Sequence, residues 1–451
     1  MTEFNYNDLK YLSVDLPQEV KFYKFSGDFE GELRIIDKFL KRNIPEALRK
    51  RLMIEKIFAE GLQDNYYTSF EELLEGLRKH YTKVTAENLE EIIGFGNVDF
   101  IMKNGERAFE CQALSNILGQ HGGFLSELET GVKYEFKPNA FNRDIIKRME
   151  EGTLKGCEFL VEEHMSVAPE FQRPGKKIRV WLPYPCENGT QSDIELVESS
   201  HPVFISEGPQ RTAYFEKIYE PGDEFFVKFR YKNTVKFVKP DPASVSESQP
   251  SMPEYTGEIL PHISFTGTIK ALAEEIRGEE TNPLILARRV YDWISDHVNY
   301  SYVRDYLYID NIPESVILNG YGDCGTMVLV FVTLLRCMGI PAKWQSGSSV
   351  KPNYIGSHDW AMFYIAPYGW LYCDPSYGNS EDKLRHEHYF GNLDPFRLVA
   401  ADEFQSRFDP PKKFLRMDPY DNQSGEAEYE DENLFFDGCV KWRRVLEWKE
   451  F

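Results

Sequence analysis

The sequence predicts an α+β fold made of several domains. At 451 residues the chain is too long for one ordinary hydrophobic core. Apolar residues recur at three- and four-residue spacing through much of residues 1–155, which is typical of amphipathic helices. Apolar and polar residues alternate in several segments of residues 157–237, which is typical of β-strands. Helix and strand patterns then occur together in the segment that follows.

Residues 1–155 are expected to form a mainly helical N-terminal region. Ser69 is followed three residues later by Glu72, the spacing of a capping box at a helix start. Asn104-Gly105 lies between two short apolar segments and predicts a β-hairpin turn. The clearest helical patterns cover residues 35–40, 47–62, 69–80, 86–93 and 143–150.

Residues 156–240 are expected to form a small β-rich domain. Turn residues separate its strand-like segments, and strands this short favour a β-sandwich or a curled sheet. The predicted strands are residues 157–167, 177–182, 193–197, 213–218 and 225–237.

A linker is expected at residues 241–262, which are rich in Pro, Ser, Glu and Asp. The core domain is assigned to residues 263–400 and a C-terminal extension packed on it to residues 401–451. Pro283 follows Asn282, a good N-cap, and predicts the start of a helix. The other expected elements of the core are a helix at 269–277, a helix after Cys324, and strands near 342–345, 358–365 and 369–374.

Charge and cysteine content limit the class of protein. A formal net charge of −21 and a pI near 5.0 argue against a nucleic-acid partner, because phosphate binding needs clustered positive surface. The seven cysteines are odd in number and irregularly spaced, which favours reduced thiols in a cytoplasmic protein over a disulfide framework. The longest apolar run is too short to span a bilayer, so no membrane partner is expected.

Cys324 is the strongest candidate for a functional residue. It precedes the apolar run Met327–Met338, which Gly339 and Pro341 end in the manner of a helix C-terminus. A cysteine at a helix N-terminus faces unpaired N–H groups and the helix dipole, which lower a thiol pKa from about 8.5 to roughly 3.5–7.5. The neighbouring Asp323 would oppose this effect, and the helix dipole and His358 should outweigh it if the Asp323 carboxylate points to solvent.

His358 and Asp374 follow in the order expected of a general base and the group that orients it. If residues 365–367 connect the two arms of a hairpin, Trp360 faces Tyr372 and His358 faces Asp374. Directly opposed residues have Cβ atoms roughly 4.5–5.5 Å apart. This register would bring imidazole and carboxylate together, whereas a one-residue slip would separate them.

An oxyanion site needs hydrogen-bond donors. The backbone N–H of Cys324 is the expected first donor, and Tyr300, Tyr302 or the indole of Trp360 is the candidate second. His386-Glu387-His388 lacks a third ligand nearby and is not assigned to a metal. Neither a metal nor any other cofactor is expected.

These motifs together resemble the transglutaminase-like superfamily. The resemblance is carried by Gly322-Asp323-Cys324-Gly325, the run Leu334–Ala342, His358-Asp359-Trp360-Ala361 and Gly369–Ser376, and covers residues 283–380. It implies a papain-like α+β core, with Cys324 as nucleophile, His358 as general base and acid, and Asp374 as the residue that orients His358. The β-rich segment resembles the domain that often precedes this core in bacterial members. Animal crosslinking members use calcium, and no calcium loop of recognisable spacing is found here.

The resemblance implies a cysteine-dependent hydrolase of amide bonds, a thiol protease acting on peptide or protein substrates through a thioester. Two alternatives stay open. An amine instead of water could accept the acyl group, giving crosslinking or deamidation, or the domain could be a non-catalytic binding scaffold. The sequence does not decide between them, nor does it fix the oligomeric state.

Overall fold

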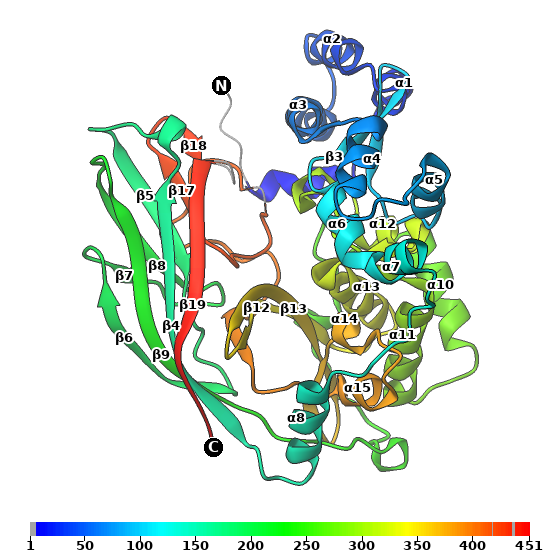
Figure 1. The fold of residues 1–451 in the computed structure, drawn as a ribbon, viewed down its shortest axis with the longest axis vertical. Coiled ribbons are helices and arrows are strands. Elements are labelled where there is room, and N and C mark those ends of the chain that lie inside the picture. Colours follow the sequence, from blue (N-terminus) through cyan, green and yellow to red (C-terminus); the bar gives the residue numbers. More distant parts are fainter. Residues whose placement is uncertain (1–5, 417, 435–437) are drawn as a thin grey trace. The chain divides into compact units, whose positions relative to one another are not determined.

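A computed structural model describes residues 6–416, 418–434 and 438–451. The chain forms two compact units, each built from separate stretches of sequence (Figure 1). Unit 1 comprises Met1–Lys137, Glu258–Ile269 and Asp296–Val330, and unit 2 comprises Pro138–Gly257, Lys270–Ser295 and Phe331–Phe451. Helices α10 (Gly267–Arg277), α11 (Pro283–His297) and α13 (Cys324–Cys337) supply residues to both. The α+β prediction is confirmed.

Unit 1 is mainly helical in its N-terminal part, as predicted. The capping box is present, with Ser69 Oγ accepting from Glu72 N and the Glu72 carboxylate accepting from Ser69 N. Asn104 and Gly105 form the turn of the β2–β3 hairpin with φ angles of 54° and 86°, so that prediction is also confirmed. The elements are η1 (Tyr6–Ser13), α1 (Gln18–Ser26), α2 (Phe29–Leu40), α3 (Glu46–Asn65), β1 (Tyr66–Thr68), α4 (Phe70–Arg78), α5 (Ala86–Gly94), β2 (Phe100–Lys103), β3 (Glu106–Glu110), α6 (Ala113–Gln120) and α7 (Gly122–Thr130).

The stretch of unit 1 that leads to Cys324 is anchored to these helices and strands. Arg304 forms an ion pair with the buried Asp99, which also accepts a hydrogen bond of 2.7 Å from the Tyr66 hydroxyl. Ser301 donates to the carbonyl oxygen of Asn97 and accepts from Asn116, both at 2.9 Å. Its elements are β10 (Asn299–Tyr300), η4 (Tyr306–Tyr308), α12 (Ile312–Asn319) and β11 (Tyr321–Gly322).

Unit 2 contains a two-sheet β-domain whose inner faces share one hydrophobic core, as in a sandwich. One sheet has the strand order β18-β17-β5-β8-β7 and the other β19-β4-β9-β6. All five predicted strands of this region are present. They are β4 (Gly156–Val167), β5 (Lys177–Pro183), β6 (Gln191–Ser199), β8 (Thr212–Ile218) and β9 (Glu224–Thr234), with β7 (Phe204–Ile205) in addition.

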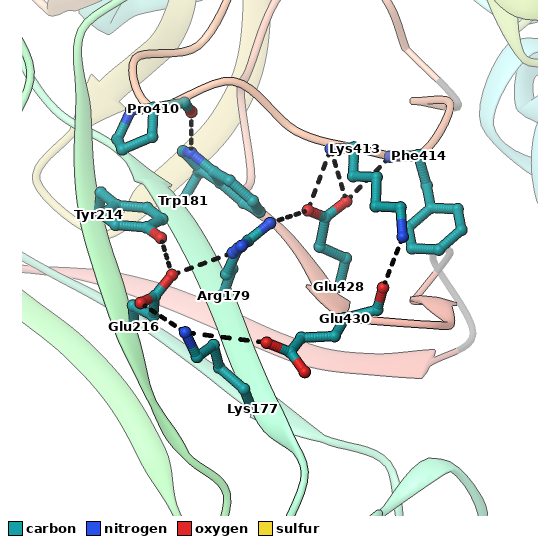
Figure 2. Close-up of polar contacts among 10 residues, drawn as sticks. All are labelled: Lys177, Arg179, Trp181, Tyr214, Glu216, Pro410, Lys413, Phe414, Glu428 and Glu430. Carbon is teal, nitrogen blue, oxygen red and sulfur yellow. Dashed lines mark hydrogen bonds and ion pairs between the residues drawn. The ribbon is translucent and has the colours of Figure 1, made fainter. Parts of the chain in front are cut away.

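The C-terminal segment adds strands to both of these sheets. β19 (Cys439–Glu450) pairs with β4 along almost its whole length (Figure 1), and β17 (Glu426–Tyr429) pairs with β5 and with β18 (Asn433–Leu434). Figure 2 shows how polar side chains join this segment to β5 and β8. Glu428 accepts from the N–H groups of Lys413 and Phe414, and the Trp181 indole donates to Pro410 O at 2.8 Å.

The same segment also touches the core sheet, through Arg443 and Ser348 at 2.8 Å and through Gln423 and Asp359 at 2.8 Å. The extension is therefore a structural part of the β-domain as well as a neighbour of the core. The domain limits given by the sequence stay predictions.

The core sheet of unit 2 has the order β15-β14-β13-β12-β16 and is antiparallel throughout. Its strands are β12 (Ala342–Lys351), β13 (Tyr354–Ile365), β14 (Gly369–Cys373), β15 (Phe390–Gly391) and β16 (Arg397–Ala401). The remaining elements of this unit are α8 (Ala140–Glu150), η2 (Pro169–Phe171), η3 (Pro242–Ser244), α9 (Pro253–Thr256), α14 (Pro375–Gly378) and α15 (Lys383–His388).

Helix α13 ends as the sequence predicts. Gly339 has a left-handed φ of 82°, and the N–H of Ile340 donates to Leu335 O at 2.9 Å. Across the part of the chain that the structure describes, no helix is both long and apolar enough to cross a membrane.

Candidate active site

Cys324 is the first residue of α13 and is buried, with 8% of its surface exposed. The helix-start position predicted from the sequence is confirmed. The N–H groups of the first helical turn have no partners within the helix, so they favour negative charge at this end. The location is consistent with a stabilised thiolate.

The Asp323 carboxylate does not point freely into solvent, so the condition under which its charge would matter little for Cys324 is not met. Its Oδ1 accepts from the N–H of Thr326 at 3.0 Å and from the Tyr306 hydroxyl at 2.6 Å, so the carboxylate caps α13. Burial raises the pKa of Asp323, while the hydrogen bonds from Tyr306 and Thr326 oppose that rise. Asp323 therefore acts first as a helix cap, a role that its sequence position alone did not reveal.

Of the two candidate tyrosine donors, Tyr300 is the better placed. Strands β10 and β11 pair in parallel, with Tyr300 opposite Gly322, two residues before Cys324. Tyr302 is 58% exposed, and the two rings meet edge to face at 6.0 Å. The pairing keeps Tyr300 beside the segment that carries Cys324.

His358 on β13 and Asp374 just after β14 are in direct contact. The His358 Nε2 and Asp374 Oδ2 atoms are 2.7 Å apart, and both residues are buried. An ionised carboxylate only accepts hydrogen bonds, so Nε2 carries the proton and Nδ1 is the basic nitrogen. This tautomer leaves Nδ1 suited to accept a proton from a nucleophile.

The hairpin register that we predicted for this contact is wrong by two residues. Met362 pairs with Tyr372 rather than with Trp370, so His358 and Asp374 are diagonal neighbours and not directly opposed. A shift of two residues leaves every side chain on its predicted face, because side chains alternate with a period of two. The predicted contact is therefore present despite the wrong register.

Asp374 is surrounded by donors on both carboxylate oxygens. Oδ1 accepts from the Ser376 hydroxyl at 3.0 Å and from the N–H of Tyr377 at 2.9 Å, so the residue also caps α14. Oδ2 lies 2.9 Å from Arg397 Nη1 in addition to His358. Burial raises the pKa of Asp374, but the charges of His358 and Arg397 outweigh it and hold that pKa well below its usual range.

The pKa of His358 is lowered, first by burial and also by the Arg397 charge, while Asp374 raises it. The imidazole is thus neutral over more of the physiological pH range than an exposed histidine. A neutral imidazole held by a carboxylate has the state required of a general base.

Sequence reasoning missed Arg397 and Tyr377. The Tyr377 ring lies against the His358 imidazole, with centroids 4.2 Å apart. The Arg397 guanidinium lies 4.6 Å from the centroid of the Tyr377 ring. Arg397 was detectable in principle, because a charged residue inside the apolar run Phe396–Ala401 has to be paired.

Gly347 is a third missed residue. It pairs with His358 across the β12–β13 ladder, and a Cβ atom there would overlap the Leu398 carbonyl oxygen on β16. The close approach of β16, which carries Arg397, therefore depends on a glycine at this position.

Trp360 is fully buried, and its indole N–H donates to Gln345 Oε1 at 2.7 Å. This bond already uses the only donor of the indole, so the structure does not support Trp360 as the second oxyanion donor. Its ring instead forms part of a cluster with Cys186, Tyr389, Leu393 and Val399.

No group of three or more His, Cys, Asp or Glu side chains within residues 6–416, 418–434 and 438–451 has the arrangement of a metal site. His386 bonds to Asp292 and to the Gly378 carbonyl oxygen, at 3.1 and 2.8 Å. The seven cysteines form no disulfide among the residues described.

Three comparisons with known proteins bear on this site. Residues 270–375 match the family model described as the transglutaminase-like superfamily, a span that contains Cys324, His358 and Asp374. An uncharacterized protein of Haemophilus influenzae is 30% identical over 141 residues, which cover 25% of this chain and 37% of that protein. The match thus spans little more than a third of that relative.

Two solved structures are also similar. One is described as a "putative cysteine protease" from Cytophaga hutchinsonii, with 15% identity, a TM-score of 0.43, and coverage of 66% of this chain and 91% of that chain. The other is the periplasmic domain of TgpA from Pseudomonas aeruginosa, with 14% identity, a TM-score of 0.30, and coverage of 54% and 94%.

Proposed function

We propose that the protein is a cysteine-dependent hydrolase of amide bonds in peptides or proteins, because residues 270–375 match the model of the transglutaminase-like superfamily. Cys324 is the nucleophile, His358 the general base and acid, and Asp374 the residue that orients His358. The observation that best supports this assignment is the 2.7 Å contact between His358 Nε2 and Asp374 Oδ2, which are both buried.

The reaction begins with transfer of the Cys324 proton to Nδ1 of His358. The thiolate attacks the substrate carbonyl carbon, forming a C–S bond while the carbonyl π electrons move to oxygen. N–H groups at the start of α13 stabilise the oxyanion, and losing one such donor typically costs roughly 100–1,000-fold in rate. The oxyanion then collapses, the C–N bond breaks, and the amine leaves with the proton from His358.

The second half of the cycle releases the acyl group from the thioester. Water donates a proton to His358 and attacks the carbonyl carbon, and the C–S bond breaks as the acid leaves. Cys324 thiolate and protonated His358 are regenerated together. Asp374 remains ionised throughout, because its charge keeps the imidazole in the Nε2–H tautomer and stabilises the imidazolium.

Selective alkylation tests the nucleophile. At neutral pH we expect iodoacetamide to modify Cys324 faster than the exposed Cys111, and much faster than Cys186, whose pKa burial raises to about 12. His358→Ala should slow the reaction of Cys324 without changing that of Cys111. Equal rates at Cys324 and Cys111, unaffected by His358→Ala, would favour a non-catalytic scaffold.

Substrate profiling tests the reaction. We expect new amino termini or released amine when the full chain is incubated with a peptide library, and none with Cys324→Ala. The same incubation with an added primary amine separates the acyl acceptors. Incorporation of that amine in place of hydrolysis would identify an acyl transferase and overturn the hydrolase assignment.

We also propose that the protein works in the cytoplasm, without nucleic-acid or membrane partners. The odd number and irregular spacing of the seven cysteines and the net charge of −21 support this proposal. Counting alkylatable thiols in protein taken directly from cells provides the test, because an oxidising compartment would leave fewer than seven.

A further inference from the structure

Arg397 is buried beside Asp374, with an exposed fraction of only 1%. It shares one carboxylate oxygen with the general base: Asp374 Oδ2 is 2.9 Å from Arg397 Nη1 and 2.7 Å from His358 Nε2. A buried guanidinium is a costly group to place in a protein interior unless it is paired. Its direct contact with the orienting carboxylate calls for a functional explanation.

The guanidinium is itself held in place from its other end. Arg397 Nη2 donates to Asp394 Oδ2 at 2.9 Å, and the Tyr389 hydroxyl donates to the same oxygen at 2.7 Å. The Arg397 side chain also stacks against Tyr377 and Trp360, at 4.6 and 5.2 Å from the ring centroids. A side chain fixed by two carboxylates and two rings has little freedom to release Asp374.

The charged and titratable groups around His358 in unit 2 come from several elements. Asp374 contacts the imidazole directly, and the Tyr377 ring on α14 lies against it. Arg397 on β16 forms an ion pair with Asp374, and Asp394 in turn forms an ion pair with Arg397. Lys351 on β12 and Arg385 on α15 lie farther out, each against the Tyr377 ring, at 5.3 and 5.0 Å. Arg397 alone among these cations forms an ion pair with Asp374 in the described structure.

We propose that Arg397 is a positioning residue of the proposed reaction: by sharing Asp374 Oδ2 with His358, it keeps the carboxylate ionised and immobile and withholds part of its negative charge from the imidazole. The inference rests on the proposed function for its catalytic meaning, but the electrostatic coupling exists independently of turnover. Arg397 fixes the tautomer through Asp374, and it limits how strongly the imidazole holds its proton. Both effects support a base that must accept and release a proton in each cycle.

The direct test is NMR titration of His358 in the full chain labelled at its nine histidines, in a Cys324→Ala background. The signal is assigned by its loss in His358→Gln. Arg397→Met should raise the His358 pKa by about 1 unit, because it removes a nearby like charge. Arg397→Lys keeps a charge but lacks the two separate nitrogen donors with which the guanidinium reaches Asp374 and Asp394, so it should give a smaller rise.

Arg385→Met is the matched control, because it removes a guanidinium that also stacks on Tyr377 but has no ion pair with Asp374. It should leave the His358 pKa nearly unchanged. Asp394→Asn provides a test with the opposite sign and keeps the proposal falsifiable if Arg397→Met does not fold. With less compensation of the Arg397 charge, the His358 pKa should fall.

An unchanged or lowered pKa in folded Arg397→Met, an equal rise in Arg385→Met, or no fall in Asp394→Asn would overturn the inference. In protein with intact Cys324, Arg397→Met should also move the acidic limb of kcat/KM to higher pH, because His358 must be neutral to act as the base. The two proposals fail separately. A wild-type chain without hydrolase activity refutes the function, whereas an active chain with an unmoved His358 pKa refutes the role of Arg397.

Discussion

The two faces of strand β13 meet buried carboxyl groups whose pKa values are shifted in opposite directions. On the face of His358, Asp374 is fully buried and its pKa lies well below the usual range. On the other face, the neighbouring Asp359 meets Asp421, which is 2% exposed and has a pKa raised well above the usual range. Ser357 on this second face and Asp421 also line a cavity of about 170 Å³.

Because burial acts on both groups in the same sense, their neighbouring charges decide in which direction each pKa shifts. Burial is the largest influence on both and raises both pKa values. Asp374 then faces His358 and Arg397, whereas Asp421 faces Asp359, whose like charge raises its pKa further. The carboxyl group on the His358 face therefore favours its charged form, whereas Asp421 on the other face favours its protonated form.

The largest expected effect comes from removing the charge on the His358 face. Asp374→Asn should lower kcat/KM by roughly 10³–10⁴-fold, because the amide favours the wrong imidazole tautomer. Asp421→Asn, the same change on the other face, should leave kcat/KM within about threefold, since burial and the charge of Asp359 already favour the neutral form of Asp421. Steady-state kinetics on both folded variants checks the contrast, and similar losses in the two would contradict it.

The second effect concerns stability as a function of pH. A carboxyl group whose folded pKa is raised contributes stability that is present at low pH and is lost as pH rises through the folded pKa. Wild-type protein should therefore lose stability relative to Asp421→Asn as pH increases, since the amide does not titrate. For Asp374 the sign is reversed, and its contribution is present at neutral pH and lost only in acid.

Urea denaturation of wild type and Asp421→Asn between pH 5 and pH 9 measures this difference. Parallel stability curves would show that Asp421 is ionised in the folded protein. The matched variant Asp193→Asn, at an exposed carboxylate that forms an ion pair with Lys232, should follow the wild-type curve closely.

Sequence patterns predicted the His358 side of this comparison well, because they depend on periodicity. The helix start at Cys324, the hairpin and the shared face of His358 and Asp374 all follow from repeats of 3.6 or 2 residues. The exact pairing of residues between β13 and β14 did not follow from these repeats, because the residues at the hairpin turn allow more than one loop length. A two-residue error was harmless, whereas an error of one residue would have separated the pair.

The long-range parts of the structure were not predictable in the same way. β19 pairs with β4 across more than 270 residues of sequence, and its own pattern resembles that of a surface segment because alternate residues remain partly exposed. Arg397 reaches Asp374 only because β16 pairs with β12 beside Gly347. Contacts of this kind depend on which strands become neighbours, and local periodicity does not contain that information.

A smaller effect is expected from a neutral hydrogen bond on the His358 face. Trp360→Phe removes the indole donor to Gln345 Oε1 and leaves that buried acceptor without its partner, at a cost of about 1–3 kcal/mol. Gln345→Met alone should also destabilise the protein. The double variant should lose less than the sum of the two, because the same bond is counted in both. Strict additivity in urea denaturation would show that the bond contributes little.

The smallest effect distinguishes neutral contacts from charges beside His358. Tyr377→Phe keeps the ring against the imidazole but removes the hydroxyl bond to Ser349 Oγ, which is 3.1 Å long and worth about 1 kcal/mol. The His358 pKa should barely move, because no charge changes. A His358 shift as large as that of Arg397→Met would mean that packing, and not the charge of its neighbours, controls the imidazole, and the contrast between the two faces of β13 would then need a different cause.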